Sequence, residues 1–160
     1  MKQTLIEAKI RISPSIEEYQ SADGRVAITA DPLDIRQVED SVTNIGYGGI
    51  VTFTGRVRNI HEGQEVIALE YEAYTKMAAR VIEDLIARAE KVWPTVALAV
   101  HHRLGPLKLG EIAVVVVAAS AHRAPAFEAN QWLISTLKDE VPIFKRETRA
   151  NGTVWVGQGP

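Results

Sequence analysis

The sequence has no cysteine among its 160 residues. This excludes disulfide bonds, thiolate zinc sites, a cysteine nucleophile and a persulfide carried on the chain itself. Basic residues are not in excess either, because 18 Lys and Arg stand against 20 Asp and Glu, and aromatic residues make up only 6%. A general nucleic-acid binder normally shows a basic excess, so any anion site must be a local cluster of cations.

Long apolar runs are also missing, and none approaches the roughly 20 residues that span a bilayer. At the N-terminus, Ile6, Ala8, Ile10 and Ile12 alternate with polar residues. This is a strand pattern, not the uninterrupted apolar core of a signal peptide, and we expect a cytoplasmic protein with no membrane contact. The 46% hydrophobic content is enough for one domain with a proper core.

The hydrophobic periodicity predicts one α+β domain with a mixed or antiparallel sheet covered by helices. We interpret residues 1–25 as an N-terminal extension or edge hairpin, and 26–160 as the domain. The order expected from residue 26 is β-α-β-β-α-β-β-α-β-β. The expected strands are 26–29, 49–59, 66–74, 95–104, 112–119, a short extended piece after Pro142 that carries Lys145, Arg146 and Glu147, and 153–156. The expected helices are 31–43, 76–93 and one ending before Pro142.

The region from Ser120 to Glu147 holds an unusual group of cations. His122 and Arg123 lie at the start of the predicted helix, where free backbone N–H groups and the helix dipole favour an anion. Lys138 lies near its other end, at the edge of an apolar stripe, where desolvation would lower the lysine pKa toward a catalytically useful range. The alternative for such a lysine is a side chain that simply extends to solvent.

The predicted strand 49–59 carries a second pair of cations. Alternation places Arg56 and Arg58 on one face, where their forked donors could hold a phosphate or carboxylate, although a solvated strand face is the simpler alternative. We expect this strand to pair in antiparallel fashion with 66–74. His101 and His102 are adjacent on one strand and so point to opposite sides, which argues against a metal ion bound by both.

Several motifs occur together in a fixed order. They are VTFTGRVRN (51–59), LEYEAY (69–74), HRLGPLKLGE (102–111), SAHRAPAFEA (120–129) and LKDEVPIFKRE (137–147). With them, the chain from about Val26 to Trp155 closely resembles the catalytic (large) subunit family of molybdopterin synthase. The resemblance implies an α/β-hammerhead-like fold, a sulfurtransferase of molybdenum cofactor biosynthesis, and no cofactor or metal of its own.

The family resemblance also implies the reaction and the partners. The substrate is cyclic pyranopterin monophosphate, which receives two sulfur atoms as a dithiolene. The sulfur arrives as a thiocarboxylate on the C-terminal Gly-Gly of a small ubiquitin-like subunit, and the absence of cysteine fits an external sulfur donor. Two large subunits form a homodimer within a heterotetramer, so that parts of a pocket could come from the second copy.

Site residues follow from the same resemblance. Lys138 matches the lysine beside the partner's C-terminus, and Lys145 matches the second essential lysine. The substrate-binding set comprises both lysines together with Arg56, Val57, Arg58, His122, Arg123, Arg146 and Glu147. We expect Lys138 to stabilise a tetrahedral oxyanion and Lys145 to act as a proton donor or as an electrostatic partner of the phosphate.

Three other functions are alternatives to the sulfurtransferase interpretation. One is a non-catalytic module that docks a ubiquitin-like partner, and another is a sensor that binds a phosphorylated metabolite. The third is a nucleic-acid-binding domain, which the acidic balance and the few aromatic residues disfavour. Without the resemblance, the residues indicate only an α+β domain with an anion site.

Overall fold

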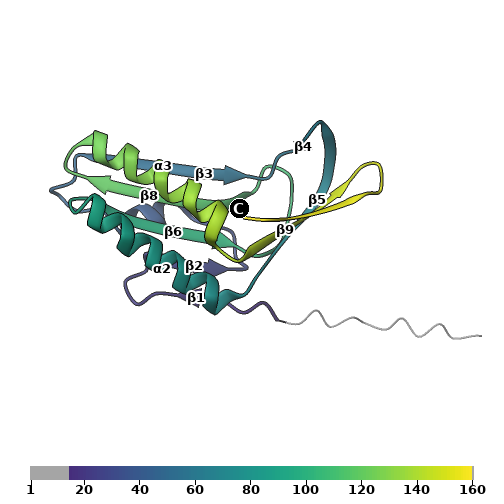
Figure 1. The fold of residues 1–160 in the computed structure, drawn as a ribbon, viewed down its shortest axis with the longest axis horizontal. Coiled ribbons are helices and arrows are strands. Elements are labelled where there is room, and N and C mark those ends of the chain that lie inside the picture. Colours follow the sequence, from purple (N-terminus) through teal and green to yellow (C-terminus); the bar gives the residue numbers. More distant parts are fainter. Residues whose placement is uncertain (1–14, 160) are drawn as a thin grey trace, which may run out of the picture.

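The computed structural model describes residues 15–159. The strand predicted within residues 6–12 lies outside this range. The elements follow in the order β1 (Tyr19–Gln20), β2 (Val26–Thr29), α1 (Ile35–Asp40), β3 (Gly49–Arg56), β4 (Ile60–His61), β5 (Gln64–Ala73), α2 (Thr75–Val92), β6 (Ala97–Arg103), β7 (Gly105–Leu107), β8 (Ile112–Ser120), α3 (Arg123–Glu140), β9 (Ile143–Arg149) and β10 (Val154–Gln158). The predicted α+β class is confirmed, but the strands form two sheets instead of one (Figure 1).

The first sheet has the strand order β1-β2-β6-β8-β3, and only β2 and β6 run parallel. Strand β8 lies inside this sheet and is apolar on both faces. Val116 and Ala118 pack in the core beneath α2 and α3, whereas Val115 and Val117 pack toward α1. This alternation explains why the sequence 112–119 has no polar face, and the prediction of a central strand is confirmed.

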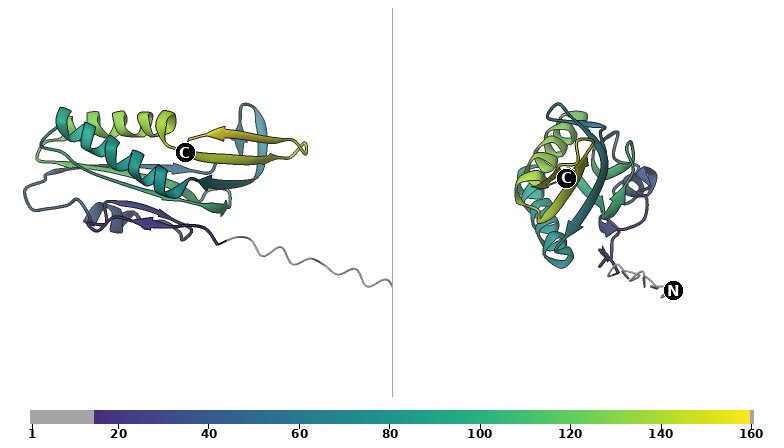
Figure 2. Two further views of the ribbon diagram at one scale, coloured as in Figure 1. Left: turned by 60° about the horizontal axis from the view of Figure 1, so that its bottom comes forward. Right: turned by 90° about the vertical axis from the view of Figure 1, so that its right-hand side faces the viewer.

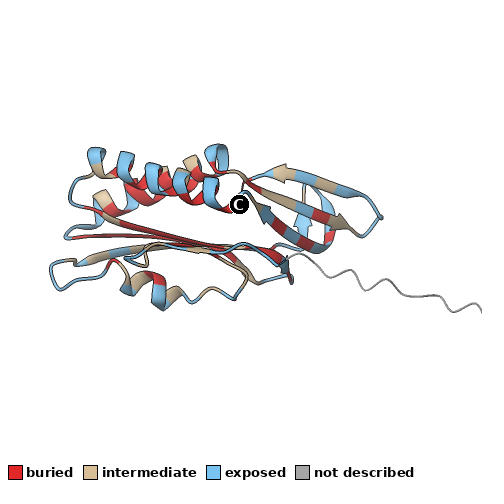
Figure 3. Cartoon of the chain, turned by 90° about the horizontal axis from the view of Figure 1, so that it is seen from below, coloured by how far each residue is buried: buried red, intermediate tan, exposed pale blue. Residues whose placement is uncertain are grey.

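The helices cover both faces of this sheet. Figure 3 shows α2 and α3 on one side of the buried strands and α1 on the other. Helix α1 is shorter than predicted because the Asp34 carboxylate accepts the backbone N–H groups of Arg36 and Gln37, which caps the helix after Pro32. At the sheet edge, β1 pairs with β2 through Tyr19 opposite Ile28, so residues 19–29 form a hairpin.

The second sheet is antiparallel, with the order β10-β9-β5-β4 and with β7 paired to β5 (Figure 1, right-hand side). The predicted pairing of 49–59 with 66–74 is therefore wrong. Strand β3 pairs with β8 and ends at Arg56, where the register shifts. The chain then reverses at Glu62 and Gly63, whose φ angles are 50° and 73°, as a tight hairpin turn requires. Across this turn Ile60 and His61 pair with β5, and the Asn59 carbonyl accepts the Val66 N–H at 2.8 Å.

The end of α3 brings the two sheets together. The helix stops at Glu140 because Val141 is extended and Pro142 follows, and β9 begins at once. Strand β10 then returns to this corner, where the Gly159 N–H donates to the Ile143 carbonyl at 2.7 Å. Figure 2 shows the second sheet extending beyond the ends of α2 and α3. Within residues 15–159, no helix is long and apolar enough to cross a membrane.

Candidate active site

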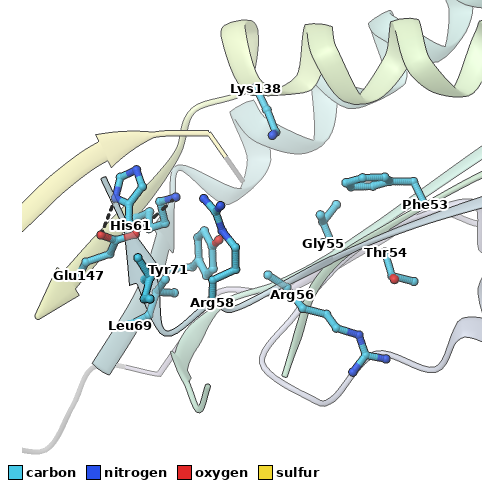
Figure 4. A pocket seen from close by; sticks show the side chains of 14 residues that line it. Phe53, Thr54, Gly55, Arg56, Arg58, His61, Leu69, Tyr71, Lys138 and Glu147 are labelled. Atoms are coloured by element: carbon cyan, nitrogen blue, oxygen red, sulfur yellow. Dashed lines mark hydrogen bonds and ion pairs between the residues drawn. The ribbon is translucent and has the colours of Figure 1, made fainter. Parts of the chain in front are cut away.

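A pocket of about 500 Å³ opens where the two sheets meet beside the last turn of α3. Its wall includes the end of β3, the hairpin that follows, the inner faces of β5 and β9, and α3 (Figure 4). Four cations line it, namely Arg56, Arg58, Lys138 and Lys145. Among the lining residues, all of which lie in the described part of the chain, Glu147 is the one carboxylate. The pocket is therefore suited to an anion.

Lys138 occupies the last turn of α3, one turn after the buried Ile134. This end of a helix carries the negative pole of its dipole and favours a cation. The side chain is exposed and extends from the helix toward the pocket and Arg58 (Figure 4). The desolvation that we predicted for Lys138 is thus absent, because the apolar stripe of α3 faces the first sheet and Lys138 lies beyond its edge.

Desolvation instead acts on Lys145. Its side chain is 17% exposed and that of Glu147 is 4% exposed, and the two lie on the same face of β9 with Nζ and Oε1 3.7 Å apart. Burial lowers the pKa of Lys145, and Arg58 and Lys138 lower it further, whereas Glu147 opposes the shift. A lysine with this environment can release a proton more readily than an exposed one.

The two arginines diverge instead of sharing a face. The Arg58 guanidinium points toward Lys138, and that of Arg56 points away and donates to the Gly110 carbonyl at 3.2 Å (Figure 4). The strand alternation that we extended to Arg58 stops at Arg56, where β3 ends. Val57, between them, is 5% exposed and packs in the core, so it does not line the pocket.

His122 and Arg123 lie far from this pocket of the same chain. They occupy the N-terminal end of α3, and Lys138 lies 15 positions after Arg123, which corresponds to about 22 Å along a helix. Both side chains are exposed. Their backbone packs closely on the start of β3, since a Cβ added to Gly49 would lie 3.2 Å from the Arg123 Cα. A Cβ added to Gly48 would likewise lie 3.1 Å from the Ala121 carbonyl oxygen, so both glycines allow this close approach.

Arg146 also lies outside the pocket. It alternates with Lys145 and Glu147 along β9 and is exposed on the opposite face of the strand. The structure thus brings together Arg56, Arg58, Lys138, Lys145 and Glu147 of the predicted set, and leaves Val57, His122, Arg123 and Arg146 elsewhere.

Sequence reasoning missed three aromatic residues. His61 bonds through Nδ1 to the Glu147 carboxylate at 2.8 Å, and the Trp155 ring contacts His61 edge-on with ring centroids 4.9 Å apart. Tyr71 lines the pocket, and burial, with the nearby Glu147 charge, raises its pKa to about 12, so that it remains a neutral phenol. The Glu-Gly turn after His61 was the available signal, because it reverses the chain over β9.

The histidines of β6 serve other contacts. His101 bonds through Nε2 to the Gly24 carbonyl and His102 through Nδ1 to the Arg103 carbonyl, each at 2.8 Å. They thus make separate contacts, as the strand alternation predicts. Within residues 15–159, no group of three or more His, Asp or Glu residues is arranged to hold a metal ion.

The geometry defines a class of protein. It is an α+β protein whose cationic pocket can bind an anionic substrate, stabilise a developing oxyanion and exchange a proton through a partly desolvated lysine. Such a combination is typical of an enzyme that acts on a phosphorylated or carboxylated molecule.

Comparisons with known proteins define the family. A family model described as MoaE protein matches residues 28–140. Molybdopterin synthase catalytic subunit 1 of Mycobacterium tuberculosis is 43% identical over 133 residues, which cover 83% of this chain and 90% of that protein. The catalytic subunit of Homo sapiens is 38% identical over 166 residues, with 95% and 88% covered.

Solved structures agree with this relationship. Molybdopterin synthase from Staphylococcus aureus superposes with a TM-score of 0.77 at 34% identity, covering 83% of this chain and 96% of that one. A complex of subunits 1 and 2 of molybdopterin-converting factor from Helicobacter pylori shares the fold, with a TM-score of 0.64 at 22% identity and 79% and 86% covered. The chain therefore belongs to the MoaE protein family. The predicted resemblance is confirmed, and so is the expectation of an enzyme acting as a molybdopterin synthase catalytic subunit.

Proposed function

We propose that this protein transfers sulfur from the C-terminal thiocarboxylate of a small ubiquitin-like subunit to cyclic pyranopterin monophosphate, and so forms the dithiolene of molybdopterin. The observation that carries the proposal is the convergence of Lys138, Lys145 and Arg58 on one pocket of about 500 Å³. The absence of cysteine fits a sulfur donor that enters this pocket from outside the chain.

Lys138 is the residue that meets the incoming tail. It stands at the exposed rim, where a C-terminal Gly-Gly segment can approach without displacing core residues. In each transfer the thiocarboxylate sulfur forms a bond to a substrate carbon while a carbon–oxygen bond of that carbon breaks, and the displaced oxygen leaves with a proton. Water then cleaves the partner's carbon–sulfur bond and supplies the oxygen of its new carboxylate. The Lys138 ammonium stabilises the oxyanion that develops on the partner's carbonyl.

Lys145 acts deeper in the pocket as the proton donor. Its lowered pKa favours proton release to an oxygen leaving the substrate, and Glu147 keeps it protonated before that step. Arg58, which points toward Lys138, neutralises the phosphate of the substrate.

His122 and Arg123 enter the proposal through a second copy of the chain. At about 22 Å from Lys138 along α3, they cannot reach the substrate in the same pocket. A homodimer within a heterotetramer, as expected from the family, would allow one protomer to supply them to its partner. The proposal also includes a cytoplasmic location, which fractionation of cells expressing the protein would test.

The experiment is a turnover assay with thiocarboxylated small subunit and cyclic pyranopterin monophosphate. We compare wild type with Lys138→Ala and with Lys91→Ala, a control in the last turn of α2 whose side chain is exposed and does not line the pocket. Dithiolene product from wild type and Lys91→Ala, with near-complete loss in Lys138→Ala at retained partner affinity, supports the proposal. A folded, partner-bound wild type that makes no product would refute the proposal and favour a non-catalytic module that binds the partner.

A further inference from the structure

The hairpin formed by β4 and β5 places His61 over the inner face of β9. Its ring has a side-chain exposure of 17% and lines the pocket beside Lys145 and Glu147. The two turn residues adopt positive φ angles, and His61 lies directly opposite Gln64 in the ladder. A tight turn of this kind fixes the register, and hence fixes the side of the hairpin on which the ring lies.

Glu147 depends on this ring. The carboxylate is buried, with a side-chain exposure of 4%, and a buried carboxylate is costly unless it is hydrogen-bonded. Oε2 is 2.8 Å from the His61 Nδ1, and Oε1 is 3.7 Å from the Lys145 Nζ. Glu147 therefore makes its short contact with His61. Its longer contact is with Lys145, the residue proposed to donate a proton.

Trp155 holds the ring from a third side. It lies opposite Glu147 on β10 and contacts His61 edge-on, and the Lys145 Nζ is 5.4 Å from its ring centroid. The indole folds back over Gly157, where an added Cβ would lie 2.0 Å from the ring. Only glycine leaves room for this arrangement, so the sequence Trp-Val-Gly supports the position of His61.

We propose that His61 is a positioning residue for the transfer reaction, whose Nδ1–H holds the Glu147 carboxylate in the orientation that faces Lys145. This inference rests on the proposed function, because it concerns the same pocket. His61 acts through Glu147 and does not itself exchange a proton with the substrate. Neither the family motifs nor the sequence periodicity points to this residue.

Several charged groups influence the pKa of Lys145. Glu147 on β9 favours its ammonium form, whereas Arg58 and Lys138 disfavour it. His61 itself faces a second carboxylate, Glu62 of its own turn, with Nε2 and Oε1 4.0 Å apart, and Arg149 of β9 lies 3.5 Å from Glu62. Loss of the His61 donor leaves Glu147 free to reorient, so Lys145 loses its nearest counter-charge and titrates at lower pH.

The test compares two substitutions of His61. His61→Asn places an amide N–H near the position of Nδ1, whereas His61→Leu removes the donor and keeps an apolar side chain. We expect His61→Leu to lower kcat about 10- to 100-fold with little change in KM, because one hydrogen bond to a charged group is lost. The alkaline limb of its pH–rate profile moves to lower pH. His61→Asn retains most of the rate and the wild-type limb.

Two kinetic outcomes would overturn the inference. One is a wild-type kcat and pH limb in His61→Leu, and the other is an equal loss in His61→Asn, which would indicate a purely structural ring. An NMR titration of the Lys145 Cε resonance in wild type and His61→Leu gives an answer that does not depend on turnover. If wild type makes no product, the proposed function fails. The NMR titration then still shows whether His61 controls Lys145, and an unchanged titration contradicts the inference.

Discussion

Glu147 follows Lys145 by two residues on β9, and its buried carboxylate lies 3.7 Å from the Lys145 ammonium. The pair occupies the inner part of a pocket whose other lining charges, among residues 15–159, are positive. Glu147 is thus the counter-charge that favours the ammonium form of a partly desolvated lysine.

Removal of this counter-charge should alter the pH dependence of turnover. In Glu147→Gln the carboxylate no longer opposes burial, Arg58 and Lys138, so the pKa of Lys145 falls further. A proton donor is active below its pKa, and the rate is lost as pH rises through it. We therefore expect the alkaline limb of the kcat profile to move to lower pH. An unchanged limb would mean that another group is the donor.

Substitution of Lys145 separates its two possible roles. Lys145→Arg keeps a positive charge, but a guanidinium does not release its proton in this pH range. We expect Lys145→Arg and Lys145→Ala to be similarly inactive, each with kcat lowered about 10²- to 10⁴-fold, as is typical for loss of general acid catalysis. Steady-state kinetics measure this. Substantial activity in Lys145→Arg alone would assign the residue an electrostatic role at the phosphate.

Gly159 supports the end of α3, and its substitution should destabilise the protein. A Cβ at this position would lie 2.6 Å from the Lys138 carbonyl oxygen, and its φ is +90°. Gly152 has a similar φ of +84° with open space around it, which makes Gly152→Ala a matched control. We expect Gly159→Ala to lower the free energy of unfolding by about 1 kcal/mol more than the control does.

Denaturant unfolding with activity measured in parallel tests this expectation. Because the Gly159 backbone packs against Lys138, we also expect lower turnover in Gly159→Ala than in Gly152→Ala. Equal stability and equal activity of the two variants would show that the C-terminal segment does not position Lys138.

The buried His102 makes the free energy of unfolding depend on pH. Burial lowers its pKa from 6.5 to about 4, so below pH 6.5 the unfolded chain binds a proton that the folded state resists. Stability is therefore lost as pH falls from 6.5 toward 4, by about 3 kcal/mol for this group. His102→Gln should show a smaller loss between pH 7 and 5 than wild type, measured by denaturant unfolding. His122→Gln, at an exposed position, should retain the wild-type slope.

Local features of the fold could be predicted from the sequence. Pro142 set the end of α3, and the unbroken apolar run at 112–119 identified a strand buried on both faces. The partner of β5 could not be predicted, because strand pairing is non-local and the register shift at Gly55 and Arg56 leaves no clear mark in the pattern.

Only part of the site could be predicted, because its geometry also depends on non-local contacts. Lys138 and Lys145 came from motifs and both line the pocket, whereas periodicity placed Arg56 and Arg58 on a shared face that the end of β3 abolishes. Burial also depends on tertiary packing. The desolvated lysine is the one on β9 beneath Trp155, not the one at the edge of the helix stripe.

The most direct measurement follows the sulfur atom. Small subunit carrying a ³⁴S-labelled C-terminal thiocarboxylate is incubated with this protein and cyclic pyranopterin monophosphate, and the dithiolene product is analysed by mass spectrometry. The account predicts labelled sulfur in the product and an unlabelled carboxylate on the partner. Product without label, or label that remains on the partner in the presence of both substrates, would contradict it.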